Sequence, residues 1–301
     1  MPVEYPTTRA SGASARDRAR DIESAFADTS VTAVLATIGG DDQITVIRHL
    51  DPEPIAANPK PFFGFSDNTN LLHFLWRLGI VSYHGGHPMV HLGRAGGVHP
   101  LTMDSLRSAL FRDGWYELTC PTEFGDEHGS WAEPKTLVDE PPTRPATPWA
   151  WSGPVDRVVE APTWGGNLEI ISWLLQAGRV GPVEDYAGHV LVAETSEEMP
   201  SSTEVYRILR NMGERGLLAD CPAVLHGRPK AWNFDRPLSV PDREAFAASQ
   251  RAAITTAFAE YAPDALVVLD LDIGHTDPQL VIPIGGTVRV DGPARRIGVR
   301  Y

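Results

Sequence analysis

The chain has 301 residues, long enough for one large or two medium-sized domains. Its composition, 42% hydrophobic and 22% charged, is typical of an ordinary globular protein. The formal net charge of −13 argues against a nucleic-acid-binding face, which needs clustered Lys and Arg. The sequence has no apolar run near the roughly 18 residues that span a bilayer, no apolar signal core and no CxxC motif. We therefore expect a cytoplasmic protein without a nucleic-acid or membrane partner.

Helices and strands are predicted to alternate in the first third of the chain. Apolar residues at helical spacing and short β-branched runs indicate these elements. The predicted helices cover residues 14–28, 68–79 and 102–114, and the predicted strands cover 31–40, 61–65 and 80–86. Alternation of this kind indicates parallel βαβ units with helices on both faces of a sheet.

The composition changes in the second third, where Pro, Gly, Trp and acidic residues become frequent. Beyond this segment a second α/β series follows, and it ends in a predicted hairpin around Asp291 and Gly292. We therefore predict two α/β domains, residues 1–116 and 161–301, joined by a loop-rich linker over residues 117–160.

Ser66 lies between a predicted strand and a predicted helix, in the stretch Gly64-Phe65-Ser66-Asp67-Asn68. This stretch is close to the G-x-S-x-G nucleophile elbow, except that Asn68 stands where the last glycine belongs. Such a turn would lift the hydroxyl off the sheet and direct the amides of Asp67 and Asn68 toward an incoming carbonyl oxygen. Read alone, the stretch is equally compatible with a serine that caps the helix.

Two further residues at predicted strand ends could complete a nucleophilic site. His275 could take the proton of a serine hydroxyl, and activity would then fall below about pH 6. Glu194 ends an apolar strand and could orient the imidazole. In isolation, His275 is at least as compatible with a role in a loop, and Glu194 with that of a surface acid.

Two other motifs are less specific. The pair Gly39–Gly40 could let backbone amides approach a ligand, although turns use this pair constantly. His84, His87 and His91 have a spacing that could suggest a metal, but Pro88 interrupts a helix and no acidic residue is suitably placed. We therefore expect no metal. The chain has no GxGxxG and no Walker A motif, so we expect no cofactor either.

Several motifs occur in an order that resembles a known family. They are AVLATIGGDDQITVIRHLD, PKPFFGFSDNTNLL, YHGGHPM, GGNL, HVLVAET and DIGHTDPQLVIPIGG. This series resembles the LD-carboxypeptidase family of serine peptidases over nearly the whole chain. The TIGG sequence and the Trp-rich insertion favour the branch that includes the microcin C self-immunity proteins.

The resemblance implies a Ser–Glu–His triad. The nucleophile motif of the family corresponds to Ser66, the glutamate that ends a strand to Glu194, and the histidine of its G-H-T-x-P motif to His275. The nucleophile would come from the first domain and its two partners from the second, so the active site would lie at the interface.

The resemblance also implies the surroundings of this triad. The backbone amides of Asp67 and Gly40 would form the oxyanion hole, and Asn167 would lie near the substrate. The implied fold is a flavodoxin-like N-terminal parallel-sheet domain followed by a smaller C-terminal α/β domain. The first domain is expected to lack the first strand and helix of the family, and a homodimer is expected.

The function implied is a serine hydrolase that cleaves an amide bond. Two substrates remain open: the amide between L- and D-centred residues of a murein tetrapeptide, and the bond between an acyl-amino acid and a nucleotide-like sulfamate or phosphoramidate. Trp131, Trp149 or Trp151 could stack on an adenine or could simply pack within loops. The alternative is a catalytically inactive, truncated homologue that acts as a binding module.

Overall fold

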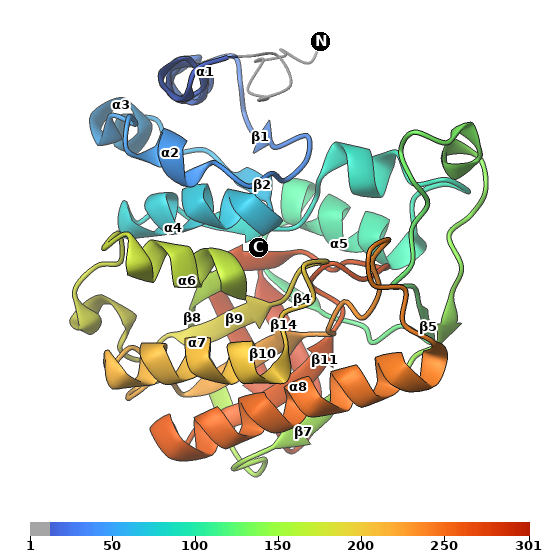
Figure 1. Ribbon diagram of the computed structural model, residues 1–301. Coiled ribbons are helices and arrows are strands. Elements are labelled where there is room, and N and C mark those ends of the chain that lie inside the picture. Colours follow the sequence, from blue (N-terminus) through green and yellow to red (C-terminus); the bar gives the residue numbers. More distant parts are fainter. Residues whose placement is uncertain (1–12) are drawn as a thin grey trace.

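The computed structural model describes residues 13–301. Figure 1 shows the blue-to-cyan N-terminal part packed against the yellow-to-red C-terminal part. The helices are α1 (Ala15–Ala27), α2 (Ile44–Ile47), α3 (Pro52–Ala57), α4 (Thr69–Arg77), α5 (Pro100–Phe111), α6 (Leu168–Gln176), α7 (Ser202–Glu214) and α8 (Val240–Tyr261). Shorter helical segments are η2 (Ser66–Asn68), η3 (Pro88–Leu92), η4 (Pro134–Leu137) and η5 (Val183–Tyr186). None of the described helices is long and apolar enough to cross a membrane.

The N-terminal part contains a four-stranded sheet in the order β1-β2-β3-β12. Its strands are β1 (Val34–Leu35), β2 (Phe62–Gly64), β3 (Ser82–His84) and β12 (Ile282–Ile284). The strands β1, β2 and β3 are parallel, as predicted from the alternation of strands and helices. The strand β12 comes from the C-terminal part of the chain and pairs antiparallel with β3. The two parts therefore share backbone hydrogen bonds.

The C-terminal part contains an eight-stranded sheet in the order β4-β14-β13-β8-β9-β10-β11-β7. Its strands are β4 (Trp115–Glu117), β7 (Ala150–Ser152), β8 (Val158–Asn167), β9 (Val190–Glu194), β10 (Ala223–Gly227), β11 (Leu266–Leu271), β13 (Thr287–Asp291) and β14 (Arg296–Arg300). The four central strands, β8 to β11, are parallel. A separate two-stranded ribbon joins β5 (Glu123–Phe124) to β6 (Arg144–Pro145).

The α/β class with parallel sheets is confirmed, and the predicted terminal hairpin forms between β13 and β14. The short helices α2 and α3, within residues 44–57, were not predicted. The C-terminal part, expected to be the smaller domain, contains the larger sheet. Two strands of this sheet, β4 and β7, come from residues 115–117 and 150–152, before the predicted start of the second domain. The predicted domain boundaries themselves stay a prediction.

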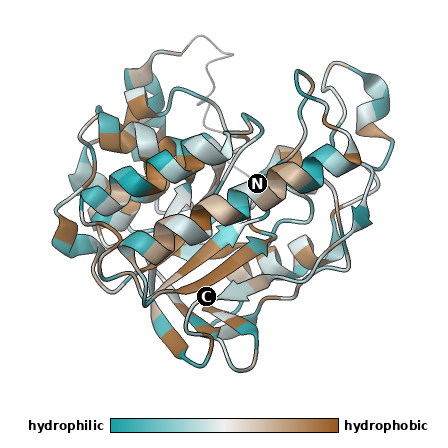
Figure 2. Ribbon diagram, turned by 60° about the horizontal axis from the view of Figure 1, so that its bottom comes forward, coloured by the Kyte–Doolittle hydropathy of each residue, from teal (hydrophilic) through white to brown (hydrophobic). Residues whose placement is uncertain are grey.

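Aromatic side chains fill the contact between the two parts. Trp76 of α4, Trp164 of β8 and Tyr186 of η5 form a cluster, with ring centroids 4.9 Å apart for Trp76–Tyr186 and 4.5 Å apart for Trp164–Tyr186. The side chains of Trp164 and Tyr186 are each 1% exposed. Figure 2 shows strands with long hydrophobic stretches in the interior of the molecule. The apolar core is therefore continuous from one sheet to the other.

Substitution of Trp164 tests this packing. We expect Trp164→Ala to lower the free energy of unfolding by about 3–5 kcal/mol, because it leaves a large cavity between the two sheets. Denaturant unfolding measures the change. Trp115→Ala is the matched control, because Trp115 is 50% exposed, and its cost should stay below about 1 kcal/mol. Equal costs for the two variants would contradict a core shared by the two parts.

Candidate active site

Ser66 lies on a sharp strand-to-helix turn. The strand β2 ends at Gly64, and Ser66 has a φ of 60°, in the left-handed region that non-glycine residues rarely adopt. A Cβ atom at Gly64 would lie 2.9 Å from Cβ of Asn68, so only glycine fits where the chain folds back. Backbone strain of this kind is typical of turns that present a nucleophile.

Asn68 and His87 hold the turn in place. Phe65 N–H donates to His87 Nε2 at 3.1 Å, and Asn68 Nδ2 lies 3.0 Å from the same nitrogen. His87 Nε2 is therefore an acceptor, and the ring carries its proton on Nδ1. Asn68 also accepts from Gln43 Nε2 at 2.9 Å and donates to Ile38 O at 3.2 Å. The residue that departs from the G-x-S-x-G pattern thus ties the turn to the neighbouring loop.

The three histidines of the HGGHPMVH stretch pack around Phe65. The ring centroids of His84, His87 and His91 lie 5.9, 4.3 and 5.6 Å from that of Phe65. Burial lowers the pKa of His84 to about 4 and that of His91 to about 3, so both rings are neutral near pH 7. Within residues 13–301, no group of three or more His, Cys, Asp or Glu side chains could hold a metal ion.

The Gly39–Gly40 loop lies directly against the serine turn. A Cβ at Gly39 would lie 2.9 Å from Ser66 Oγ, and one at Gly40 would lie 3.2 Å from Asp67 Oδ2. The carboxylate of Asp67 accepts hydrogen bonds from the amides of Asp42, at 3.0 Å, and Gln43, at 2.9 Å. The loop and the turn therefore form one unit around the serine hydroxyl, and this close approach requires glycine.

Glu194 and His275 form a close pair at the carboxyl ends of β9 and β11. Glu194 ends β9 and is 0% exposed, and its Oε2 lies 2.6 Å from His275 Nδ1. Burial by itself raises the pKa of Glu194, but the charge and hydrogen bond of His275 outweigh burial and lower this pKa below its ordinary value. The carboxylate is ionised, and it fixes the Nδ1–H tautomer of the imidazole when the ring is neutral.

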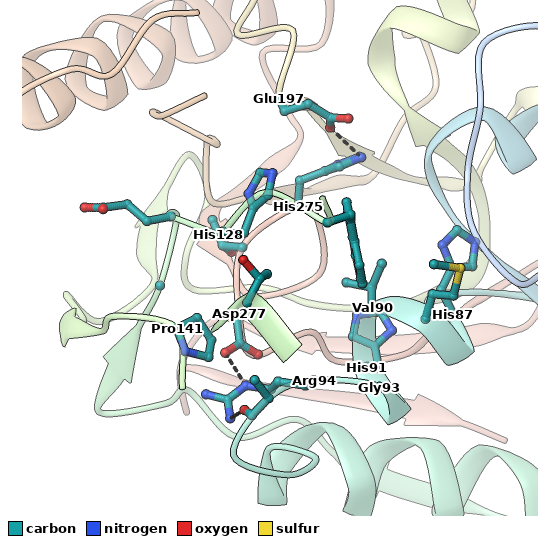
Figure 3. A pocket seen from close by; sticks show the side chains of 18 of the residues that line it. His87, Val90, His91, Gly93, Arg94, His128, Pro141, Glu197, His275 and Asp277 are labelled. Carbon is teal, nitrogen blue, oxygen red and sulfur yellow. Dashed lines mark hydrogen bonds and ion pairs between the residues drawn. The ribbon is translucent and has the colours of Figure 1, made fainter. Parts of the chain in front are cut away.

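The other nitrogen of His275 faces a second carboxylate. Nε2 lies 3.4 Å from Oε2 of Glu197, as the dashed line in Figure 3 shows. Burial lowers the pKa of His275, but the charges of Glu194 and Glu197 and the hydrogen bond from Glu194 outweigh it and raise the pKa to about 9. No hydrogen bond joins His275 to Ser66 among the described residues. The ring of Phe65, next to Ser66 in the chain, lies 4.9 Å from the imidazole.

Asn167 lies behind Glu194. Its Nδ2 donates to Glu194 Oε1 at 3.1 Å, and its Oδ1 accepts from Ile170 N–H at 3.0 Å and so caps α6. Its own amide donates to Thr69 Oγ1 at 2.9 Å. These contacts orient Glu194, whereas the proposed contact of Asn167 with substrate stays a prediction.

Ser66 and His275 line the same cavity, which has a volume of about 550 Å³. This volume suits a small-molecule ligand. The segment at residues 125–142, part of the predicted linker, supplies much of the wall. Trp131, which is 49% exposed, lies in this wall. In contrast, Trp149 donates to Asp272 Oδ2 at 2.9 Å, and Trp151 lies on β7 beside Arg295.

Three residues that sequence reasoning missed also line the cavity: His128, Glu197 and Lys230. Figure 3 places His128 and Glu197 near His275. Lys230 follows β10, and Glu197 follows β9. Their positions beyond the carboxyl ends of parallel strands could have identified them from the sequence as candidate site residues.

The strained Ser66 turn and His275, paired with the buried Glu194, meet at one cavity. An arrangement of this kind is typical of serine hydrolases. The chain matches the family descriptions "LD-carboxypeptidase N-terminal domain" over residues 3–85 and "LD-carboxypeptidase C-terminal domain" over residues 160–290. It belongs to this LD-carboxypeptidase family and is a serine-type carboxypeptidase or amide hydrolase.

Individual relatives agree with this assignment. The chain is 25% identical to the microcin C7 self-immunity protein MccF of Escherichia coli, covering 94% of this chain and 78% of the relative. It is 27% identical to a probable murein peptide carboxypeptidase of Bacillus subtilis, covering 89% of this chain and 72% of the relative. Its fold is similar to the structure of MccF in complex with glutamyl sulfamoyl guanosine, with a TM-score of 0.75, 22% identity, and coverage of 96% of this chain and 82% of that one.

The electrostatic surroundings of His275 predict its titration. The imidazole should titrate near pH 9, and Glu197→Gln should lower this pKa, because the variant removes a negative charge 3.4 Å from Nε2. NMR titration of the ring resonances measures both values. Glu198→Gln, at the exposed neighbouring position, is the control and should leave the titration unchanged. A midpoint near pH 6.5 in the unmodified protein would contradict the described geometry.

Proposed function

We propose that the chain hydrolyses an amide bond with Ser66 as nucleophile, His275 as general base and Glu194 as the group that orients His275. The observation that carries this proposal is the 2.6 Å contact between the fully buried Glu194 and His275 Nδ1 beside the strained Ser66 turn. A hydroxyl is a weak nucleophile until a base removes its proton, and an oriented imidazole is suited to that task.

In the proposed reaction each of these groups has a defined role. As Ser66 Oγ attacks the substrate carbonyl carbon, its proton passes to His275 Nε2, and Glu194 stabilises the imidazolium that forms. The oxyanion is held by the backbone amides of Asp67 and Gly40. The C–N bond then breaks, and His275 gives the proton to the leaving amine. Water, activated by the same imidazole, hydrolyses the acyl-serine ester.

In the free protein His275 Nε2 faces Glu197. To act as the base, this nitrogen must turn from Glu197 to Ser66 Oγ when substrate binds. Hydrogen bonds of catalytic groups are often long in unliganded sites and tighten in the complex. Phe65 directly precedes Ser66, and its ring centroid lies 4.9 Å from that of His275. This proximity supports a short movement of the imidazole toward Ser66.

Two substrate classes are supported. A fold neighbour is a complex with glutamyl sulfamoyl guanosine, and Trp131 in the cavity wall offers a surface on which a base can stack. A relative named as a probable murein peptide carboxypeptidase favours a murein tetrapeptide. Incubation with each compound, followed by assay of the released amine, separates them. A cytoplasmic location and a homodimer are further parts of this proposal.

Labelling with a fluorophosphonate tests the nucleophile. The unmodified protein should label at one serine, and Ser66→Ala should abolish both labelling and hydrolysis, with a loss of activity of at least about 10³-fold. Ser152→Ala, on β7 away from the cavity, is the control and should label normally. Failure of the folded, unmodified protein to label would favour the inactive binding module instead.

The pH dependence tests the base. Only neutral His275 can accept the serine proton, and its pKa is raised to about 9 in the free protein. We therefore expect kcat/KM to rise from pH 6 to about pH 9 and then level off, rather than to fall only below about pH 6. Glu197→Gln should move this rise to lower pH. A profile that is flat between pH 6 and pH 9 would count against His275 as the base.

A further inference from the structure

Lys230 is a buried cation in the wall of the cavity. It follows β10, which lies between β9 and β11 in the sheet. The chain beyond β9 carries Glu197, and the chain beyond β11 leads to His275. The carboxyl ends of these parallel strands lie at one edge of the sheet, so the loop with Lys230 reaches the same cavity as the proposed triad. Lys230 is only 4% exposed.

The other cations that line the cavity are already paired. Arg94 lies 2.7 Å from Asp277 and 3.1 Å from Glu140. Lys135, at the rim with a side chain that is 70% exposed, lies 2.8 Å from Glu133. In the part of the chain that the structure describes, Lys230 makes no ion pair with a carboxylate.

The acidic groups whose charges act on Lys230 have other partners. Asp126, whose charge acts on Lys230, is bound by Arg144 at 2.7 Å and by Arg243 at 2.9 Å. The carboxylate of Glu197 faces His275. Lys230 is thus a surplus positive charge in a partly desolvated wall, and burial lowers its pKa to about 8. Burying an unpaired ammonium costs free energy, and an anionic ligand would offset that cost.

His128 leaves most of the hydrogen-bonding capacity of Lys230 free. Nζ of Lys230 donates to His128 Nδ1 at 3.1 Å, which leaves the other N–H groups of the ammonium for a ligand. Burial and the charge of Lys230 lower the pKa of His128 to about 4, so its ring is neutral and carries its proton on Nε2. The pair therefore holds donors and one net positive charge beside His275.

We propose that Lys230, supported by His128, binds the anionic group that the substrate carries next to the scissile amide nitrogen. This inference rests on the proposed function, because His275 must pass its proton to that nitrogen. In a carboxypeptidase substrate the terminal carboxylate lies one carbon atom beyond the nitrogen. In a nucleotide-like substrate the phosphoramidate group is bonded directly to it. Both place an anion on the leaving-group side of the site.

The test compares a murein tetrapeptide that has a free terminal carboxylate with the same peptide as its terminal amide. We expect Lys230→Met to lower kcat/KM for the acid by at least about 30-fold, mainly through KM, and to change the value for the amide by less than about threefold. Lys230→Arg should recover part of the loss. The same comparison is made with an aminoacyl phosphoramidate nucleotide. The anionic compound whose kcat/KM falls in Lys230→Met identifies whether the subsite binds a carboxylate or a phosphoramidate.

Control measurements distinguish a failure of the Lys230 subsite proposal from a failure of the proposed Ser66–His275–Glu194 triad. Fluorophosphonate labelling of Ser66 should be equal in the unmodified protein and in Lys230→Met, and the thermal midpoint should not fall. Arg112→Met, which removes an exposed cation that does not line the cavity, should leave kcat/KM within about threefold.

Binding to Ser66→Ala, measured by calorimetry, tests the subsite even if no hydrolysis is found. A preference for acid over amide that disappears in the Ser66→Ala, Lys230→Met double variant supports the subsite independently of catalysis. Equal effects of Lys230→Met on acid and amide, or no preference of the Ser66→Ala protein for any of the anionic compounds, would overturn the proposal.

Discussion

The carboxylate of Glu194 is completely removed from water, and the arrangement of the cavity depends on how that charge is compensated. Transfer of an ionised carboxylate from water to a protein interior costs several kcal/mol unless strong partners replace its hydration. His275 supplies the closest contact, Asn167 donates to the other oxygen, and His84 lies 4.0 Å away. The positions of all three partners are therefore constrained by one buried charge.

This constraint also joins the two parts of the molecule. Asn167 contacts Glu194 with its side chain, while its backbone amide donates to Thr69, the first residue of α4. A Cβ at Gly166 would lie 2.6 Å from Thr69 Oγ1, so the end of β8 approaches the serine turn as closely as glycine allows. These contacts consequently fix the position of the Ser66 turn relative to the Glu194–His275 pair. The aromatic cluster around Trp164 supplies the apolar part of the same contact.

Sequence patterns predicted the elements that carry a clear local periodicity or a continuous apolar run, and they missed others, including the ten-residue strand β8. The helix α1 and the strands β9 to β11 have clear periodicity or continuous apolar runs, and these are local properties. The helices α2 and α3 contain four and six residues, too few to show a helical period. The strand β12 joins the first sheet through pairing with residues about 200 positions away, which no local pattern reports.

The sequence by itself determined the α/β class, the strand-to-helix turn at Ser66 and the polar residues at strand ends, because alternation, glycine placement and apolar runs act over a few neighbouring residues. Only the tertiary structure decided that Asn167 lies behind Glu194, that Glu197 faces His275, and that Lys230 is a cation without a carboxylate partner among the described residues. Such contacts arise where loops from different strands meet at one edge of a sheet. Their geometry depends on how the whole chain packs.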